Sequence, residues 1–356
     1  MSAPAIPAIW FPAVRTGTGT DVFTERLVAG LIARGIRAEI TWLPLRAEYA
    51  PWTVAIPQPP AWATVCHINT WLHPRFIPAR LPVVATLHHA IHDPALRPYK
   101  GALRAVYHRH WIAPIERRVL RRADRVMAVS NFVAEMARQT LCDVPMQVIH
   151  NGVDTELFRP GNRVRRPGAP FRLLYVGAWR RLKGVDLLAP VMRELGDGFE
   201  LHFTGGPAAQ QDKAGMPGNM VDLGRLHGDD AVVAAMQDAD ALLFPSRSEG
   251  FGLVAAEAMA CGLPVVTTRS ASLVEVVAHE RTGLLCPPGD VAAFVKAIRR
   301  LANDARVLET MGVAARRDAC ERFSEQSMLD AHIRLYTAAG AAARSRISAA
   351  GPAGVR

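Results

Sequence analysis

The chain of 356 residues is half hydrophobic, and at this length two domains of ordinary size are expected in place of one large core. No apolar run reaches the roughly 18 residues that a membrane helix needs, and the N-terminus lacks a charged segment followed by an apolar one. Neither a membrane span nor a signal peptide is therefore expected. The net charge of +10 indicates attraction to an anion, which could be a nucleic acid, an anionic membrane surface or a phosphorylated substrate.

Five cysteines are scattered along the chain, and no two of them have the C-x-x-C spacing. An odd, scattered set fits reduced thiols and favours neither a disulfide frame nor a zinc site. The predicted location is cytoplasmic.

Short apolar runs alternate with helical patterns through the first half of the chain, which is typical of a parallel α/β sheet. Strands are predicted at 5–14, 36–43, 64–69, 81–87 and 126–129, with a last one from residue 148. Helices are predicted at 22–34 and 102–125, and a third follows Ser130, which is a good N-cap residue.

Gly17 and Gly19 lie in the turn between the first predicted strand and helix. The third glycine of a G-x-G-x-x-G fingerprint is absent, because Val22 stands there. This turn alone is a weak signal and does not indicate a dinucleotide site.

Histidines follow two of the predicted strands: His67 after the third, and His88 and His89 after the fourth. Polar residues at the carboxyl ends of parallel strands lie where open α/β sheets bind ligands. His88 or His89 is thus a candidate ligand-binding residue, although a histidine at a strand end is more often structural.

The predicted helix at 102–125 carries the strongest basic cluster of the chain, with seven arginines. It would contact anionic lipid headgroups or an anionic acceptor. The alternative is a solvated helix face without a binding role.

The second half repeats the same plan after a linker predicted at 158–170, which is rich in Arg, Pro and Gly. Strands are predicted at 171–176, 200–203, 220–223, 241–244 and 265–268. Helices are predicted at 229–237, 253–260, 291–301, 304–317 and 325–338, before a tail from 339 that is expected to be disordered. Arg180, Arg181 and Lys183 lie in the turn after the first of these strands and form a candidate phosphate site.

The segment from Pro245 to Thr268 combines a strand end, a glycine-containing loop and a helix that is closed by glycine and proline. Glu249 and Glu257 lie eight residues apart, one before and one inside this helix. The helix N-terminus suits a phosphate, whereas the two carboxylates would accept hydrogen bonds from sugar or ribose hydroxyls. The alternative is an acidic helix start with a solvated glutamate.

These motifs together resemble the family four glycosyltransferases, retaining nucleotide-sugar transferases of the GT-B fold. The most specific element is the E-x7-E arrangement of Glu249 and Glu257; the segment 148–154, the turn 176–184 and the segment 284–289 are also similar. The resemblance implies an α/β fold with two Rossmann-like, doubly wound parallel-sheet domains facing a cleft. The implied regions are an acceptor-side domain at 1–157, a linker at 158–170, a nucleotide-sugar domain at 171–322, a helix at 323–338 that crosses back to the first domain, and a flexible tail at 339–356.

The resemblance also implies residue roles. Glu249 would contact hydroxyls of the donor sugar and Glu257 the ribose, while Lys183 with Arg180 or Arg181 would add positive charge at the diphosphate. His88 would lie near the transferred sugar, and Gly17 and Gly19 near the diphosphate. The remaining donor-binding segment is expected to comprise Gly250, Phe251, Gly252, Leu253 and Val254.

Three departures from the family pattern matter. Ala178 replaces the arginine that usually follows the strand glycine, so Arg180 or Arg181 is its expected substitute. Thr18 separates the paired glycines of the N-terminal loop, and the D-x-x-H feature is incomplete around His67.

The implied substrates are a UDP-, GDP- or ADP-linked sugar and a glycan or lipid-linked acceptor, used in cell-surface polysaccharide or glycolipid assembly. No metal, no other cofactor and no nucleic acid is expected, and the arginine-rich helix suggests peripheral contact with an anionic membrane. Three alternatives stay open: a basic nucleic-acid-binding α/β protein, a dinucleotide oxidoreductase, and a GT-B protein that binds nucleotide sugars without catalysis.

Overall fold

The computed structural model describes residues 6–162 and 168–349, with side chains in the last helix described up to residue 343. The chain forms two compact units. The first unit combines the chain up to Asn151 with the residues from Ser327 onward, and the second unit is Gly152–Gln326. The linker predicted at 158–170 includes residues 163–167, which lie outside the described residues.

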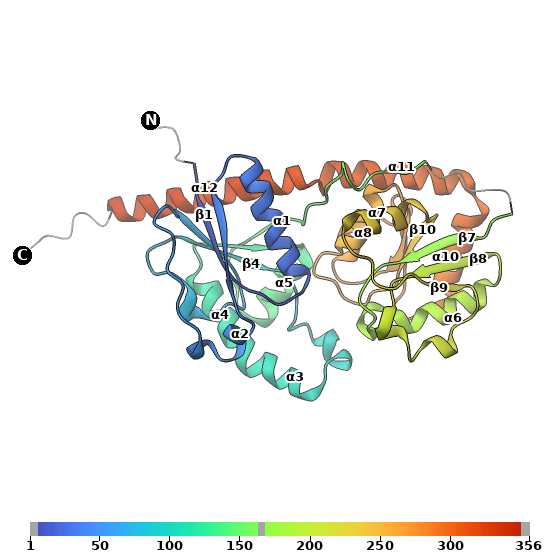
Figure 1. Cartoon of the computed structure of the whole chain (residues 1–356), viewed down its shortest axis with the longest axis horizontal. Coiled ribbons are helices and arrows are strands. Elements are labelled where there is room, and N and C mark those ends of the chain that lie inside the picture. Colours follow the sequence, from blue (N-terminus) through green and yellow to red (C-terminus); the bar gives the residue numbers. More distant parts are fainter. Residues whose placement is uncertain (1–5, 163–167, 350–356) are drawn as a thin grey trace, which may run out of the picture. The chain divides into compact units, whose positions relative to one another are not determined.

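The first unit is built on a six-stranded sheet with the order β2-β1-β3-β4-β5-β6, in which every pairing is parallel (Figure 1). The strands are β1 (Ile9–Val14), β2 (Ala38–Leu43), β3 (Val65–Asn69), β4 (Val83–Leu87), β5 (Arg125–Ala128) and β6 (Met146–Val148). The helices are α1 (Gly19–Ala33), α2 (Arg46–Tyr49), α3 (Ala102–Tyr107), α4 (Ala113–Arg122) and α5 (Asn131–Thr140).

The second unit repeats this architecture with the strand order β12-β11-β10-β7-β8-β9, again all parallel. Its strands are β7 (Phe171–Tyr175), β8 (Phe199–Phe203), β9 (Met220–Asp222), β10 (Ala241–Phe244), β11 (Val265–Thr268) and β12 (Gly283–Cys286). Its helices are α6 (Val185–Leu195), α7 (Asp229–Gln237), α8 (Leu253–Ala260), α9 (Leu273–Val276), α10 (Val291–Asn303) and α11 (Ala305–Arg322). The predicted class, α/β with two Rossmann-like doubly wound sheets, is confirmed.

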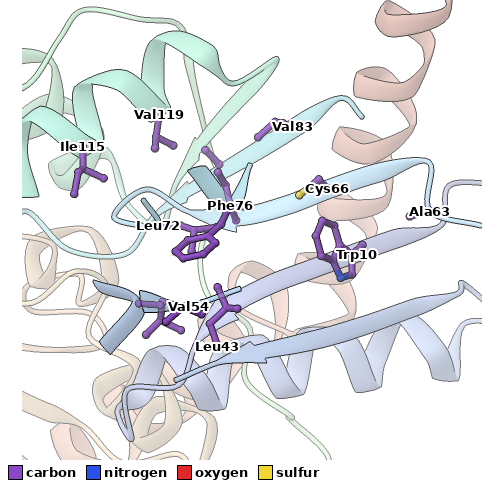
Figure 2. Packing of buried hydrophobic residues seen from close by; sticks show 14 residues of the cluster. Trp10, Leu43, Val54, Ala63, Cys66, Leu72, Phe76, Val83, Ile115 and Val119 are labelled. Carbon is purple, nitrogen blue, oxygen red and sulfur yellow. The ribbon is translucent and has the colours of Figure 1, made fainter. Parts of the chain in front are cut away.

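The core of the first unit shows why its strands are apolar on both faces. Trp10 of β1, Cys66 of β3 and Val83 of β4 lie side by side and form part of one buried face of the sheet. Ile115 and Val119 of α4 are directed at that face, as Figure 2 shows. A polar residue at any of these positions would bury an unpaired group.

The last helix, α12 (Glu325–Ala349), packs on the opposite face of the first unit's sheet. His67 of β3 lies between the Tyr336 hydroxyl, at 2.6 Å from Nδ1, and Thr86 Oγ1, at 2.5 Å from Nε2. Gly30 of α1 lies so close to Leu329 that an added Cβ would approach the leucine side chain to 2.7 Å. His67 is thus a structural residue that holds α12 on the sheet.

Several element boundaries differ from the sequence-based expectation. The arginine-rich helix ends at Arg122, because Arg125 already begins β5. Helix α12 continues past residue 338 to Ala349, because its alanine-rich sequence favours helix and Gly340 alone does not end it. Among the residues that the structure describes, no helix is both long and apolar enough to cross a membrane.

Candidate active site

The turn between β10 and α8 places the two glutamates predicted from the sequence. Gly252 caps α8 with φ of +98°, and a Cβ added there would lie 2.9 Å from Leu273 Cδ2. Glycine is favoured here because L side chains rarely adopt this φ, and an added Cβ would also displace the end of the Leu273 side chain. The Ser272 hydroxyl lies 3.0 Å from the Glu249 carbonyl oxygen and 2.9 Å from that of Phe251, which fixes the turn.

Glu249 is largely buried, and its carboxylate is held by two donors on a single oxygen. Lys183 Nζ donates to Glu249 Oε1 at 2.6 Å, and the Ser246 hydroxyl donates to the same oxygen at 2.7 Å. Because both contacts are to Oε1, Oε2 remains available to accept a hydrogen bond from a ligand hydroxyl. The structure brings Glu249 and Lys183 together, as a shared site requires.

Lys183 ends a single 3₁₀ turn, Arg181–Lys183, and is followed by Gly184 in the left-handed conformation with φ of +75°. A Cβ on Gly184 would lie only 2.0 Å from the carbonyl oxygen of Pro245. The lysine turn and the glutamate loop thus meet backbone to backbone. Arg180 precedes the turn, Arg181 begins it, and both are exposed.

Arg247 ties the same two loops together, and sequence analysis did not identify it. Its guanidinium makes a bidentate pair with Asp186, at 2.6 and 2.8 Å, and also donates to the Arg181 carbonyl. Its backbone amide donates to the Leu182 carbonyl at 3.0 Å. The Asp186 pKa is lowered: burial opposes the shift, and the hydrogen bonds and charge of Arg247 outweigh it.

Glu257 lies within α8 and is buried, with 7% of its surface exposed. Its neighbour Cys261 illustrates the local environment, since burial and the Glu257 charge raise the pKa of that thiol to about 12. A buried carboxylate at this position is suited to accept hydrogen bonds from a ligand that enters the loop side of the helix.

The neighbouring turn, where the family arginine is replaced by Ala178, is shaped by a buried tyrosine. The Tyr175 hydroxyl donates to the Ala178 carbonyl at 3.1 Å, and Gly177 donates to Thr204 Oγ1 at 3.0 Å. Burial and the charge of Glu249 raise the Tyr175 pKa, so the hydroxyl stays protonated.

Asp222, at the end of β9, organises the next two turns. Its carboxylate accepts from the amides of Gly205, Gly206 and Gly224 at 2.8 to 3.1 Å and pairs with Lys213 Nζ at 2.8 Å. Burial opposes ionisation, and these donors overcome it, lowering the Asp222 pKa to about 2. The sequence prediction placed Asp222 inside the strand at 220–223 and attached no role to it.

In the first unit a cavity of about 290 Å³ opens beside the ends of β3 and β4, and His88 lines it. His88 is only 6% exposed, and its Nε2 donates to Asn69 Oδ1 at 3.0 Å. The Phe23 ring packs against it edge-on, with centroids 4.7 Å apart. Burial lowers the His88 pKa to about 3, with the charges of His89 and His332 adding to the effect, so this imidazole is neutral.

A buried hydrogen-bond chain forms another wall of this cavity. The Thr70 hydroxyl donates to Glu116 Oε1 at 2.8 Å, and His92 Nε2 lies 2.7 Å from Glu116 Oε2. Glu116 is 2% exposed and comes from the arginine-rich helix. A carboxylate among arginines was the only signal for it in the sequence.

The glycine turn of the first unit is closed by a residue that sequence analysis overlooked. Asp21 Oδ2 accepts from the amides of Thr16 and Gly17, at 2.9 and 2.7 Å. Gly17 has φ of +70°, and Gly19 begins α1. Thr16, Thr18 and Thr20 line the cavity that contains His88, so this turn and His88 share one site.

No group of three His, Cys, Asp or Glu side chains within residues 6–162 and 168–349 is arranged to hold a metal ion. The polar groups at the strand ends of the second unit instead suit an organic ligand with hydroxyls and anionic oxygens.

Two parallel doubly wound sheets, the second with a lysine and a glutamate paired across glycine turns, are consistent in fold with the GT-B class of sugar transferases. Residues 170–304 match the family of glycosyl transferases group 1, and residues 60–157 match glycosyltransferase family 4. Glycogen synthase of Mycobacterium tuberculosis is 31% identical over 299 residues, which are 77% of this chain and 69% of that protein. The chain belongs to glycosyltransferase family 4, and its class of activity is transfer of a sugar from a nucleotide-sugar donor.

One more curated relative and two solved structures are also similar to this chain. A D-inositol 3-phosphate glycosyltransferase of Saccharomonospora viridis is 32% identical over 256 residues, covering 64% of this chain and 59% of that one. Sucrose-phosphate synthase of Thermosynechococcus elongatus has the same fold, with a TM-score of 0.75, 20% identity and coverage of 94% and 99%. HepE of Anabaena, solved in complex with UDP, has a TM-score of 0.71, 18% identity and coverage of 93% and 100%.

Proposed function

We propose that this enzyme transfers a sugar, with retention of anomeric configuration, from a nucleotide sugar to an acceptor hydroxyl in cell-surface polysaccharide or glycolipid assembly. The observation that carries the proposal is the contact of Lys183 with Glu249 at the strand ends of the second unit. In this proposal the second unit binds the donor and the first unit binds the acceptor.

The donor is held by complementary charge and hydrogen bonds. Glu249 accepts from donor-sugar hydroxyls and Glu257 from the ribose. Lys183, with Arg180 or Arg181, faces the diphosphate, and so do the amides of residues 250–254. Fixed cations and amides stabilise the negative charge that develops on the leaving nucleoside diphosphate, and we propose that they do so without a divalent metal.

In this proposal the transfer step needs no general base from the protein. The bond from the anomeric carbon to the diphosphate oxygen breaks, and the bond to the acceptor oxygen forms on the same face. The acceptor proton passes to the leaving phosphate oxygen. His88, which is neutral, acts as a hydrogen-bonding group beside the transferred sugar.

Proton NMR of the product tests this mechanism. An α-linked donor is expected to give an α-linked product from the first turnover. A β-linked product would contradict retention and the absence of a separate base.

We also propose peripheral contact with an anionic membrane through α3. None of its residues is buried, and Leu103 and Val106 are 89% and 58% exposed beside Arg104. Such a helix face inserts its apolar groups while Arg104 meets a lipid phosphate. The Leu103→Ser/Val106→Ser variant is expected to sediment less with anionic vesicles than the wild type; equal sedimentation would contradict the contact.

A further inference from the structure

A second, larger cavity of about 930 Å³ lies in the first unit next to the one that contains His88. Its wall is strongly basic. Arg97, Lys100, Arg109 and Arg117 line it, and Asp93 is the one carboxylate in the lining. Nothing in the proposed donor chemistry uses this cavity.

The positive charge of this basic cavity is only partly neutralised by the protein. Among the described residues, Arg97 and Arg109 have no carboxylate partner, and both side chains are exposed. Asp93 is one carboxylate beside four cations, so its charge offsets only part of theirs. A partly compensated cluster of this kind attracts an anion.

Two of the cations are held in place. Arg117 donates to the carbonyls of Leu141 and Thr140, each at 3.0 Å, which fixes its guanidinium. Lys100 donates to the Ile91 carbonyl. Fixed cations lose little freedom when a ligand binds, so they favour affinity.

His108 lies where the two cavities meet. It lines both of them, and it begins a π-helical turn, His108–Ile112, between α3 and α4. Such turns often occur at functional sites because they redirect side chains. His108 Nδ1 is buried and has no hydrogen-bond partner in the described part of the chain.

The environment of His108 is cationic: burial, then the charges of Lys100, Arg104 and His92, lower its pKa to about 4. A neutral imidazole surrounded by cations is suited to a ligand that brings negative charge.

We propose that the basic cavity binds a phosphate group of the acceptor, whose reactive hydroxyl lies in the adjoining cavity beside His88. The acceptor is therefore a phosphorylated molecule, and this inference rests on the proposed transferase function. Arginine recognises phosphate through two parallel hydrogen bonds, so Arg97 and Arg109 are the specificity-determining residues. A soluble sugar or polyol phosphate and a lipid headgroup present the same chemistry.

Inorganic pyrophosphate binding, measured by calorimetry, tests the cavity directly. The diphosphate region of the donor site would also take this probe, so the comparison is made in a Lys183→Gln background. In that background Arg97→Gln/Arg109→Gln is expected to weaken binding by at least about tenfold, the effect of losing two charge-assisted contacts. The control Arg80→Gln/Arg138→Gln removes the same net charge from exposed positions outside the cavity and should bind like its parent. Equal affinity of the two double variants would overturn the proposal.

Two further arms identify the source of the phosphate, with wild type and Arg97→Gln/Arg109→Gln compared in each. Glycerol 1-phosphate represents a soluble acceptor, and vesicles containing phosphatidic acid represent a lipid one. Binding that the double variant loses in either arm supports the cavity and names the source, whereas no difference in both arms refutes it. If pyrophosphate binding behaves as expected but no nucleotide sugar binds, the phosphate site stands and the transferase proposal fails.

Discussion

Lys183 and Glu249 are 66 positions apart in the sequence, yet Nζ of the lysine lies 2.6 Å from Oε1 of the glutamate. Each comes from a glycine-containing turn at the carboxyl edge of the second unit's sheet. The lysine ammonium offsets the charge of the carboxylate beside the place where a diphosphate is expected. The glutamate can then orient the sugar while the lysine attracts the phosphate.

Substituting Glu249 is expected to separate catalysis from binding. Glu249→Ala should lower kcat by about 100-fold or more, the range seen when a group that acts mainly in the transition state is removed. Nucleotide affinity should change by no more than about threefold. Steady-state kinetics and calorimetry on the same preparations check this, and an equal loss of turnover and affinity would refute the sugar-facing role.

Gly184 is expected to be irreplaceable because its Cβ would collide with the Pro245 carbonyl. The left-handed conformation alone costs an alanine about 1–2 kcal/mol. Gly184→Ala should destabilise the second unit by more than this amount. Gly289→Ala is the matched control, because Gly289 also has positive φ but has nothing near its Cβ position. Hydrogen exchange of peptides from Gly152–Gln326 measures the stability of the second unit in the two variants. Equal exchange in Gly184→Ala and Gly289→Ala would show that the backbone contact is not rigid.

Arg247 is a positioning residue for the lysine turn. Lysine cannot reproduce its bidentate pair with Asp186, so Arg247→Lys should lower kcat by about tenfold while the protein stays folded. The Arg300–Glu280 pair is more exposed, and Arg300→Lys should leave kcat unchanged. Near-wild-type turnover of Arg247→Lys would mean that the two loops hold their places without this side chain.

Acid should destabilise the first unit through its buried neutral histidines. Burial lowers the pKa of His332 to about 4 and of His88 to about 3, and it also lowers that of His67, whereas the unfolded chain titrates near 6.5. Below pH 6.5 the unfolded state therefore binds more protons, and stability falls as pH falls. The slope is at most about 1.4 kcal/mol per pH unit for each histidine.

Tryptophan fluorescence is a suitable probe, because six of the seven tryptophans belong to the first unit. The urea midpoint is expected to drop between pH 7 and pH 5, and His332→Gln should reduce that drop while the exposed-site variant His279→Gln should not. A midpoint independent of pH would contradict the neutral, buried state of these histidines.

The fold was predictable because its signals are local. Apolar runs, N-cap residues and glycine turns each indicate the backbone conformation of a short segment. The N-cap at Ser130 is an example, because its hydroxyl accepts from the Val133 amide at 3.1 Å. The pairing of Glu249 with Lys183 is not local, and only the resemblance to a family placed both residues in one site.

Other features had no usable signal. In the sequence, Glu116 is a single acidic residue in a basic helix. Its burial against Thr70 and His92 depends on how α4 packs on the sheet. The π turn at His108 inserts one residue into a helical pattern, and Pro114 just after it, which has no backbone N–H to donate, marks a break there without indicating a π geometry. Such features arise from tertiary packing and cannot be inferred from sequence periodicity.

The central claim is that the second unit binds a nucleotide sugar through Glu257 and the loop before α8. Calorimetric titration of wild type and Glu257→Ala with UDP-, GDP- and ADP-linked sugars tests it most directly. We expect one base class to bind the wild type and to lose about tenfold or more in affinity in the variant, as the loss of a hydrogen bond to a buried carboxylate implies. If no nucleotide sugar binds the wild type, or if Glu257→Ala binds equally well, the second unit does not bind a nucleotide sugar through Glu257.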